Sequence, residues 1–245
     1  LDEILDGRLR IFQHKTGYRF SLDSIMLAHF VSLKTRARAI DLGCGNGIIP
    51  LVLAQRFPHA HFVGLEIQEN LAHLARKNSQ MNNLEDRVKI VSGDARHVKN
   101  ILPAHSFDTV IFNPPYRKLH SGRINPLQEK AIARHEIIGS LKDFLNASQH
   151  LLKPAGKVFT IYPATRFIEL VHLFRNSNIE PKRIKPVYSD NVSEAEFTLV
   201  EGRQGGREEL RMEPPLFIYD QNRHYTPEMS AIFSELSRSP SDDDG

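Results

Sequence analysis

The chain has 245 residues, of which 40% are hydrophobic and 25% are charged. This length suits one α/β domain with appendages better than two full domains, and the apolar fraction is sufficient for a buried core. No window approaches the roughly 20 apolar residues that a membrane helix requires, and no secretory signal precedes the first strand. A single cysteine, Cys44, excludes an internal disulfide framework. We therefore expect a cytoplasmic protein without membrane contact.

The formal net charge is +3. Three aspartates at positions 242–244, in a terminal stretch of small and polar residues, lower this value. That composition is typical of disorder, so residues 236–245 are expected to be a disordered tail. Without the tail the chain has a clearer basic excess, which is compatible with a nucleic-acid partner.

Residues 1–35 predict a small hairpin and a helix that pack on the rest of the chain. Residues 8–13 alternate apolar and polar side chains, and residues 18–20 should form the returning strand. Ser21 is a candidate N-cap, and Asp23 lies in the first helical turn, where the helix dipole favours a negative charge. The helix should end near Leu33.

From residue 36 to about residue 235, strands and helices alternate as one domain. Short apolar runs predict strands at 37–42, 62–67, 88–91, 109–112 and 157–162. Apolar residues at helical spacing predict helices at 48–57, 71–81, 141–152 and 167–174. The last strands, 183–188 and 195–201, have no helix between them and should pair antiparallel. The pattern predicts a doubly wound α/β fold with a seven-stranded, mostly parallel sheet and an antiparallel C-terminal hairpin. Ligands should bind at the carboxyl ends of its strands.

A glycine-rich loop follows the first strand of this domain and reads Asp41-Leu42-Gly43-Cys44-Gly45-Asn46-Gly47. Glycines allow the backbone to turn sharply and to approach a ligand closely. The spacing is G-x-G-x-G, which differs from the dinucleotide fingerprint because position 48 is isoleucine. Taken alone, the loop is equally compatible with a structural turn.

Acidic residues end the next two strands. Glu66, followed by Ile67, stands where a carboxylate can accept hydrogen bonds from both hydroxyls of a ribose. Asp94, followed by Ala95, stands where a carboxylate can accept a hydrogen bond from an adenine amine. Separately each acid is as easily a cap or a surface charge. Together with the glycine loop they resemble the cofactor motifs of class I S-adenosylmethionine-dependent methyltransferases. The resemblance implies their Rossmann-like fold and S-adenosylmethionine as the cofactor.

The tetrapeptide Asn113-Pro114-Pro115-Tyr116 follows the fourth strand. Two prolines after a strand can simply terminate it, but that does not explain the residues on either side. The side-chain oxygen of Asn113 and the carbonyl of Pro114 can each accept one N–H of a planar amine, and so direct its lone pair at a sulfonium methyl. Tyr116 offers a flat face on which an extruded base can stack. This chemistry requires no metal ion.

The tetrapeptide resembles that of amino-methyltransferases that act on adenine N6, guanine N2 or glutamine amides. It therefore indicates the kind of nitrogen more firmly than the substrate. Methylation of a glutamine amide in a protein, or of adenine in ribosomal RNA or DNA, remains open at this stage, as does a non-catalytic RNA-binding module. The short N-terminal hairpin and helix argue against the protein substrate, whose enzymes often carry a helical N-terminal domain.

A wider resemblance narrows the choice of substrate. It is carried by Gln13, residues 17–24, residues 41–50, residues 113–116, Ala133-Arg134-His135-Glu136, residues 214–219 and Tyr225-Thr226. These segments resemble the bacterial tRNA adenine-N6 methyltransferases that modify the purine beside the anticodon of a valine tRNA.

The family resemblance implies a set of roles in this chain. It makes Asn113 and Tyr116 the catalytic pair, to which the hydrogen-bonding argument adds Pro114. It also places residues of the glycine loop, of the two strand ends and of the segment before the first helix on the cofactor. The expected cofactor residues are Arg19, Phe20, Ser21, Asp41, Gly43, Gly45, Gly47, Glu66, Ile67, Asp94, Ala95 and Asn113.

Basic residues give independent support for an RNA partner. A basic stretch that includes Arg117, Lys118 and Arg134 follows the tetrapeptide and could contact phosphates beside the site. Further basic residues stand near the last hairpin, although each of them could equally belong to a solvated surface. They are Lys182, Arg183, Lys185, Arg203, Arg207 and Arg211. We expect a monomer that takes tRNA as its substrate.

Overall fold

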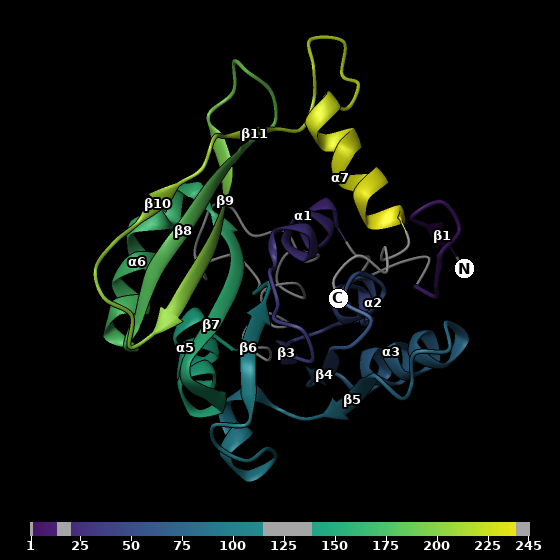
Figure 1. Cartoon of the computed structure of the whole chain (residues 1–245), viewed down its shortest axis with the longest axis vertical. Helices are drawn as coiled ribbons and strands as arrows, with labels where there is room; N and C mark the ends of the chain where they lie inside the picture. Colours follow the sequence, from purple (N-terminus) through teal and green to yellow (C-terminus); the bar gives the residue numbers. More distant parts are fainter. Residues whose placement is uncertain (1, 14–20, 115–138, 239–245) are drawn as a thin grey trace, which may run out of the picture.

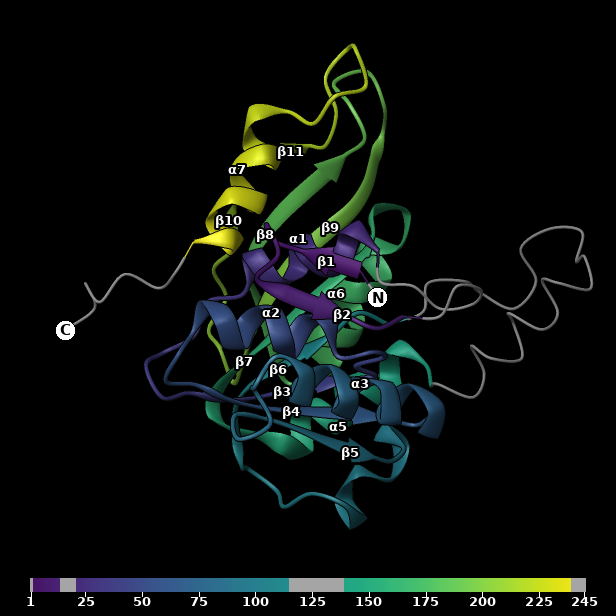
Figure 2. The same ribbon diagram turned by 90° about the vertical axis from the view of Figure 1, so that its right-hand side faces the viewer.

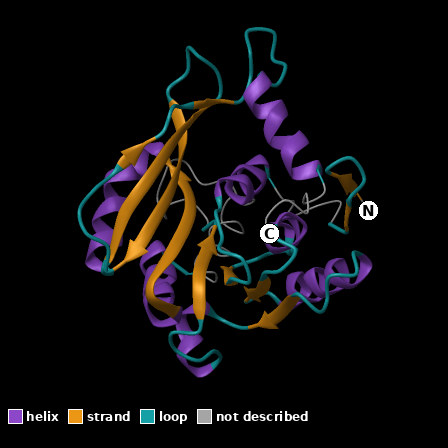
Figure 3. Cartoon of the chain, in the orientation of Figure 1, coloured by secondary structure: helices purple, strands orange, loops and turns teal. Residues whose placement is uncertain are grey.

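A computed structural model describes residues 2–13, 21–114 and 139–238 of the chain. In this part of the chain a central sheet has helices on both faces (Figures 1 and 3). The strands of this sheet are β3 (Arg38–Leu42), β4 (His61–Glu66), β5 (Val88–Ser92), β6 (Phe107–Phe112), β7 (Leu152–Pro163), β8 (Ile179–Tyr188), β9 (Ala195–Gln204), β10 (Arg211–Met212) and β11 (Leu216–Phe217). The helices are α1 (Leu22–Phe30), α2 (Ile48–Arg56), α3 (Glu69–Met81), α5 (Leu141–Leu151), α6 (Phe167–Asn176) and α7 (Pro227–Ser237), with short 3₁₀ helices η1 (Ala95–Asn100) and η2 (Ala164–Arg166).

The strand order in the described residues is β10-β8-β9-β7-β6-β3-β4-β5, and β11 pairs with β8. Strand β3 pairs in parallel with both β4 and β6, whereas β9 is antiparallel to β7 and β8. The chain therefore winds away from β3 in both directions, and the switch point lies between β3 and β6. A crevice for a ligand is expected outside the carboxyl ends of these two strands.

The doubly wound α/β fold with an antiparallel C-terminal hairpin is confirmed, and all seven predicted strands are present. The sheet of the described residues nevertheless has nine strands, because β10 and β11 add to its edge. Each has only two residues, too few to show any periodicity in the sequence. Helix α7 was also not predicted. Because it ends at Ser237, residues 236 and 237 are helical rather than part of a disordered tail.

The N-terminal hairpin is built differently from the prediction. Strand β2 (Leu9–Ile11) pairs antiparallel with β1 (Asp2–Ile4), which precedes it in the chain. The expected returning strand at 18–20 lies outside the described residues. Helix α1 begins after Ser21 as predicted, although the Ser21 side chain makes no capping hydrogen bond with the described backbone. The helix ends at Phe30, three residues before the predicted end.

Two separate groups of buried apolar side chains hold the helices to the sheet. One face of the sheet packs against α1, α2 and α7, and the other against α5 and α6. Figure 2 shows α2 and α7 on the same side of the strands. The second group includes Phe112 at the end of β6 and Phe144 of α5, whose rings lie 5.5 Å apart. The end of β6 is therefore anchored in the core just before Asn113.

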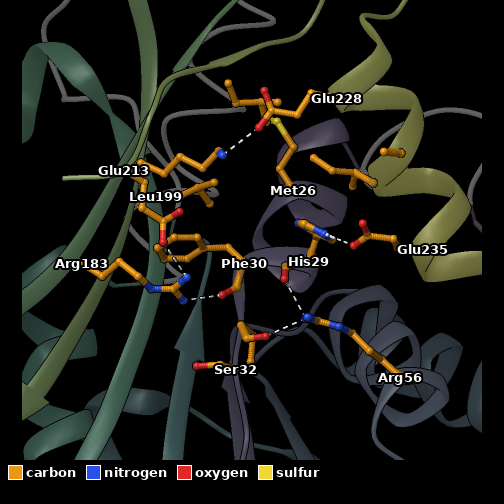
Figure 4. A pocket seen from close by; sticks show the side chains of 15 residues that line it. Met26, His29, Phe30, Ser32, Arg56, Arg183, Leu199, Glu213, Glu228 and Glu235 are labelled. Carbon is orange, nitrogen blue, oxygen red and sulfur yellow. Dashed lines mark hydrogen bonds and ion pairs between the residues drawn. The ribbon is translucent and has the colours of Figure 1, made fainter. Parts of the chain in front are cut away.

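The guanidinium of Arg56 caps the carboxyl end of α1. Its Nη1 atom donates hydrogen bonds to the carbonyls of Ala28, His29 and Val31 at 3.0, 2.7 and 2.6 Å. The last carbonyls of a helix lack partners within the helix and carry partial negative charge, which a cation at this position offsets. The side chain thereby joins α2 to the end of α1 (Figure 4).

Beside this cap, a cavity of about 410 Å³ separates α1 and α7 from the edge strands. Ion pairs line it, including Lys185–Glu228 at 2.8 Å and Arg183–Glu213 at 3.1 Å, and a hydrogen bond of 2.9 Å joins Nε2 of His29 to Glu235 (Figure 4). None of its lining residues belongs to the glycine loop or follows β4, β5 or β6. The cavity therefore lies apart from the predicted cofactor site.

We predict that Arg56→Met lowers the free energy of unfolding by about 2 kcal/mol, because three carbonyls lose a charged donor. Denaturant unfolding of the purified chain measures the change. Arg207→Met replaces an exposed arginine and serves as the matched control, which should shift stability by less than about 0.5 kcal/mol. Equal stability of the two variants would contradict the capping role.

Candidate active site

The loops that follow β3, β4, β5 and β6 meet at one edge of the sheet, because parallel neighbours end side by side. The carbonyl of Leu65 in β4 accepts hydrogen bonds from the backbone N–H groups of Gly43 and Cys44 at 2.8 and 3.1 Å. This holds the start of the glycine loop against the end of β4. The predicted meeting of the glycine loop with Glu66 and Asp94 at one edge is thus confirmed.

The glycine loop depends on glycine for its backbone path. Gly43, Gly45 and Gly47 all have positive φ, at 73°, 57° and 86°. Gly47 is also the N-cap of α2, and a Cβ atom there would lie 3.2 Å from the Cβ of Ala75. Any larger residue at this position would meet both a strained conformation and the packed side of α3.

The carboxylate of Glu66 joins the glycine loop to the start of α3. Its Oε2 accepts a hydrogen bond from the N–H of Gly45 at 2.8 Å, and its Oε1 accepts one from the N–H of Gln68 at 2.9 Å. Only 3% of the residue is exposed. Burial raises the pKa of Glu66, and the hydrogen bonds from the backbone act in the opposite direction. Each oxygen retains lone-pair capacity for a further donor such as a ribose hydroxyl.

Asp41 is a buried carboxylate whose two oxygens have no hydrogen-bond partner among the described residues. Burial raises its pKa well above the ordinary value, and the nearby charge of Glu66 raises it further. Both side-chain polar atoms of Asn46, in the same loop, also lack a partner in the described part of the chain. Unpaired buried polar groups are costly, so this concentration favours a polar ligand that supplies hydrogen-bond donors and positive charge.

Asp94 lies at the end of β5 as expected, where it is paired with Arg96. The guanidinium of Arg96 contacts the carboxylate at 2.7–3.0 Å, and the backbone N–H of Arg96 donates to it at 2.8 Å. These contacts lower the pKa of Asp94, although burial of the carboxyl acts against them. The structure therefore adds a cap of η1 to the expected ligand contact, and both roles use an ionised carboxylate.

Asn78 of α3 also contacts the candidate site, although the sequence pattern does not predict this. Its Oδ1 accepts from the N–H of Phe12 at 2.7 Å, and its Nδ2 donates to the carbonyls of Phe12 and Asn46 at 3.0 and 2.9 Å. The side chain is fully buried. One amide thus joins the N-terminal segment to the glycine loop. No local pattern marks an asparagine of this kind, because its partners lie 66 and 32 positions away.

Asn113 and Pro114 follow β6 beside the amino end of α1. The Nδ2 of Asn113 lies 3.4 Å from Oδ2 of Asp23 and 3.5 Å from the hydroxyl of Ser24. Pro114 is buried. The other expected residues, Arg19, Phe20, Tyr116, Arg117, Lys118 and Arg134, lie outside the described residues.

Residues 2–13, 21–114 and 139–238 contain no group of three or more His, Cys, Asp or Glu side chains that could hold a metal ion. No helix within the same ranges has both the length and the apolar character to span a membrane.

Comparison with known proteins agrees with this geometry. The model of the methyltransferase small domain family matches residues 20–177, which include the glycine loop, both acidic strand ends and Asn113. The chain belongs to this family. The matched residues extend from the start of α1 to the end of α6.

Relatives of this methyltransferase small domain protein cover most of its length. A tRNA1(Val) (adenine(37)-N6)-methyltransferase of Vibrio campbellii is 30% identical over 182 residues, which are 71% of this chain and 74% of the relative. A protein of the same name from Porphyromonas gingivalis is also 30% identical, over 77% of this chain and 75% of its own. Among solved structures, a predicted O-methyltransferase of Agrobacterium tumefaciens aligns with a TM-score of 0.72 at 20% identity. It covers 91% of this chain and 100% of its own, which shows the shared fold.

We predict that Asp41→Asn stabilises the ligand-free protein at neutral pH. The raised pKa means that the folded state holds a proton where the unfolded state has released it, so stability falls as pH rises from the ordinary pKa of aspartate towards the raised one. A neutral amide removes this loss. Thermal unfolding at several pH values should show a gain of more than about 1 kcal/mol near pH 7 that shrinks towards pH 4.

Asp86→Asn is the control for this experiment, because Asp86 is exposed at the protein surface. It should leave the profile of melting temperature against pH unchanged. A lower melting temperature of Asp41→Asn at neutral pH would show that the carboxylate stabilises the empty fold.

Proposed function

We propose that the chain is an S-adenosylmethionine-dependent methyltransferase that methylates N6 of an adenine in tRNA, at a position beside the anticodon of a valine tRNA. The observation that carries the proposal is the placement of Asn113 across the β3–β6 switch point from the glycine loop. The relatives supply the substrate of the proposal, since they are tRNA1(Val) (adenine(37)-N6)-methyltransferases.

The residues of the site suit this cofactor. The oxygens of Asp41, which have no partner among the described residues, lie at the start of the glycine loop, where they can accept donors and neutralise the cation of the methionine moiety. Glu66 keeps lone pairs for the ribose hydroxyls, and Asp94 for the adenine amine. When bound, S-adenosylmethionine supplies an electrophilic methyl group on a positively charged sulfur.

The chain's own contribution is to orient the nitrogen that accepts the methyl group. An adenine amine is a weak nucleophile because its lone pair is delocalised into the ring. The Oδ1 of Asn113 and the carbonyl of Pro114 can each accept one of its N–H groups. These acceptors bind more tightly as positive charge develops on N6, so they favour the transition state over the bound substrate. Tyr116 belongs to the proposal as the stacking partner of the base.

Three of the basic residues near the last hairpin, Lys182, Arg183 and Lys185, contribute less to RNA binding in this proposal than those after the tetrapeptide. Arg183 pairs with Glu201 and Glu213, and Lys185 pairs with Glu228. Lys182 donates to the carbonyl of Arg207. Because these cations already have partners within the protein, we assign contact with phosphates to Arg117, Lys118 and Arg134.

We predict that Asn113→Ala lowers the rate of methyl transfer to tRNA by about 100-fold or more, because the amine loses an acceptor that strengthens in the transition state. The affinity for S-adenosylmethionine, measured by calorimetry, should change much less. Methyl transfer from labelled cofactor to total tRNA measures the rate, and mass spectrometry of the digested tRNA locates the product.

A release-factor protein, ribosomal RNA and duplex DNA serve as alternative acceptors in the same assay. The expected product is N6-methyladenosine beside the anticodon. Label in the protein or in another nucleic acid, with none in tRNA, would overturn the proposed substrate. Transfer by Asn113→Ala at the wild-type rate would overturn the proposed catalytic residue.

A further inference from the structure

The amino end of α1 touches the side chain that the proposed function makes catalytic. Asp23 lies in the first turn of α1, and its Oδ2 is 3.4 Å from Nδ2 of Asn113 across 90 positions of sequence. Ser24, of which 1% is exposed, places its hydroxyl 3.5 Å from the same nitrogen. We propose that Asp23 is a positioning residue that holds the Asn113 amide in the one orientation able to accept a hydrogen bond from the substrate amine. The inference rests on the proposed function.

An asparagine amide has two nearly isosteric orientations that exchange its oxygen and its nitrogen. The oxygen accepts hydrogen bonds and the NH₂ group only donates them. A substrate N–H therefore requires Oδ1 to face it, whereas the flipped amide would set two donors against each other. Without a neighbour that distinguishes oxygen from nitrogen, the orientation with Oδ1 towards the substrate and the flipped orientation would differ little in energy.

The Asp23 carboxylate makes that distinction because it offers only acceptors. It favours the state in which Nδ2 faces α1, and it disfavours the flipped state, in which two oxygens would approach each other. The hydroxyl of Ser24 can donate as well as accept, so it does not select an orientation by itself. Asp23 thus favours the orientation in which Oδ1 points away from α1.

The same hydrogen bond also makes Oδ1 a better acceptor. An amide whose N–H donates to an anion gains electron density on its oxygen, since hydrogen bonds in a chain polarise one another. Distances near 3.4 Å leave room for the contact to shorten when substrate binds, as catalytic hydrogen bonds commonly do. Asp23 therefore favours methyl transfer without touching the reacting atoms.

A simpler role for Asp23 is stabilisation of α1 through the helix dipole, and the two roles have different consequences. The dipole role affects folding alone and is shared by other acids in first turns, such as Glu228 of α7. The positioning role affects turnover by way of Asn113. Asp23→Asn preserves the shape of the side chain but provides both a donor and an acceptor, so it no longer selects the amide orientation.

The test compares the wild type, Asp23→Asn and Glu228→Gln. We expect Asp23→Asn to lower kcat for tRNA by about 10- to 100-fold, with less than a threefold change in the Kd for S-adenosylmethionine and in the KM for tRNA. Its melting temperature should fall no further than that of Glu228→Gln, which should keep the wild-type kcat. A kcat within threefold of the wild type would overturn the proposal, and so would a loss of kcat matched by an equal loss of cofactor affinity.

A second measurement is independent of the substrate. The side-chain NH₂ resonances of Asn113, assigned by their absence in Asn113→Ala, should exchange slowly with solvent in the wild type and at least about tenfold faster in Asp23→Asn. Equal exchange in both proteins would overturn the positioning role even where tRNA is methylated. If the wild type transfers no methyl group to tRNA, the substrate assignment fails, and protection of the Asn113 amide alone then decides the role of Asp23.

Discussion

Glu66 joins the three loops on which the proposed site is built. Its carboxylate accepts the N–H groups of Gly45 and Gln68, and its backbone carbonyl accepts the N–H of Gly93 at 2.9 Å. One residue thereby ties the glycine loop, the start of α3 and the turn before Asp94 to the end of β4. Burial of a carboxylate is costly, and these hydrogen bonds from fixed backbone groups offset part of that cost.

Asp41 presents the opposite case, a buried carboxylate without such compensation among the described residues. Glu66 lies close enough for its negative charge to raise the pKa of Asp41 further. Loss of the proton from Asp41 would therefore place a second negative charge beside Glu66, in the loops that follow β3 and β4. A cationic ligand would offset this negative charge. The buried acids therefore favour binding of such a ligand but lower the stability of the ligand-free fold, a common relation in active sites.

Much of this architecture follows from local sequence. The strands were predicted because buried parallel strands are continuous apolar runs, and the glycine loop and its acidic followers were predicted because each stands directly after such a run. The contacts that complete the site have no local signature. Asn78 and Asp23 are ordinary polar residues of helices, and only the fold brings them to Asn46 and Asn113.

The N-terminal segment shows the same limit. The sequence predicts that residues 1–35 form a hairpin and a helix that pack on the core, but it does not indicate which polar groups they contact. In the structure the amide of Asn78 binds both Phe12 and the glycine loop, while Asp23 and Ser24 contact Asn113. One part of the segment thus shares the amide of Asn78 with the glycine loop, and another part contacts Asn113. If Asp23 has the positioning role proposed above, the orientation of the proposed catalytic amide depends on residues that precede the first strand of the sheet.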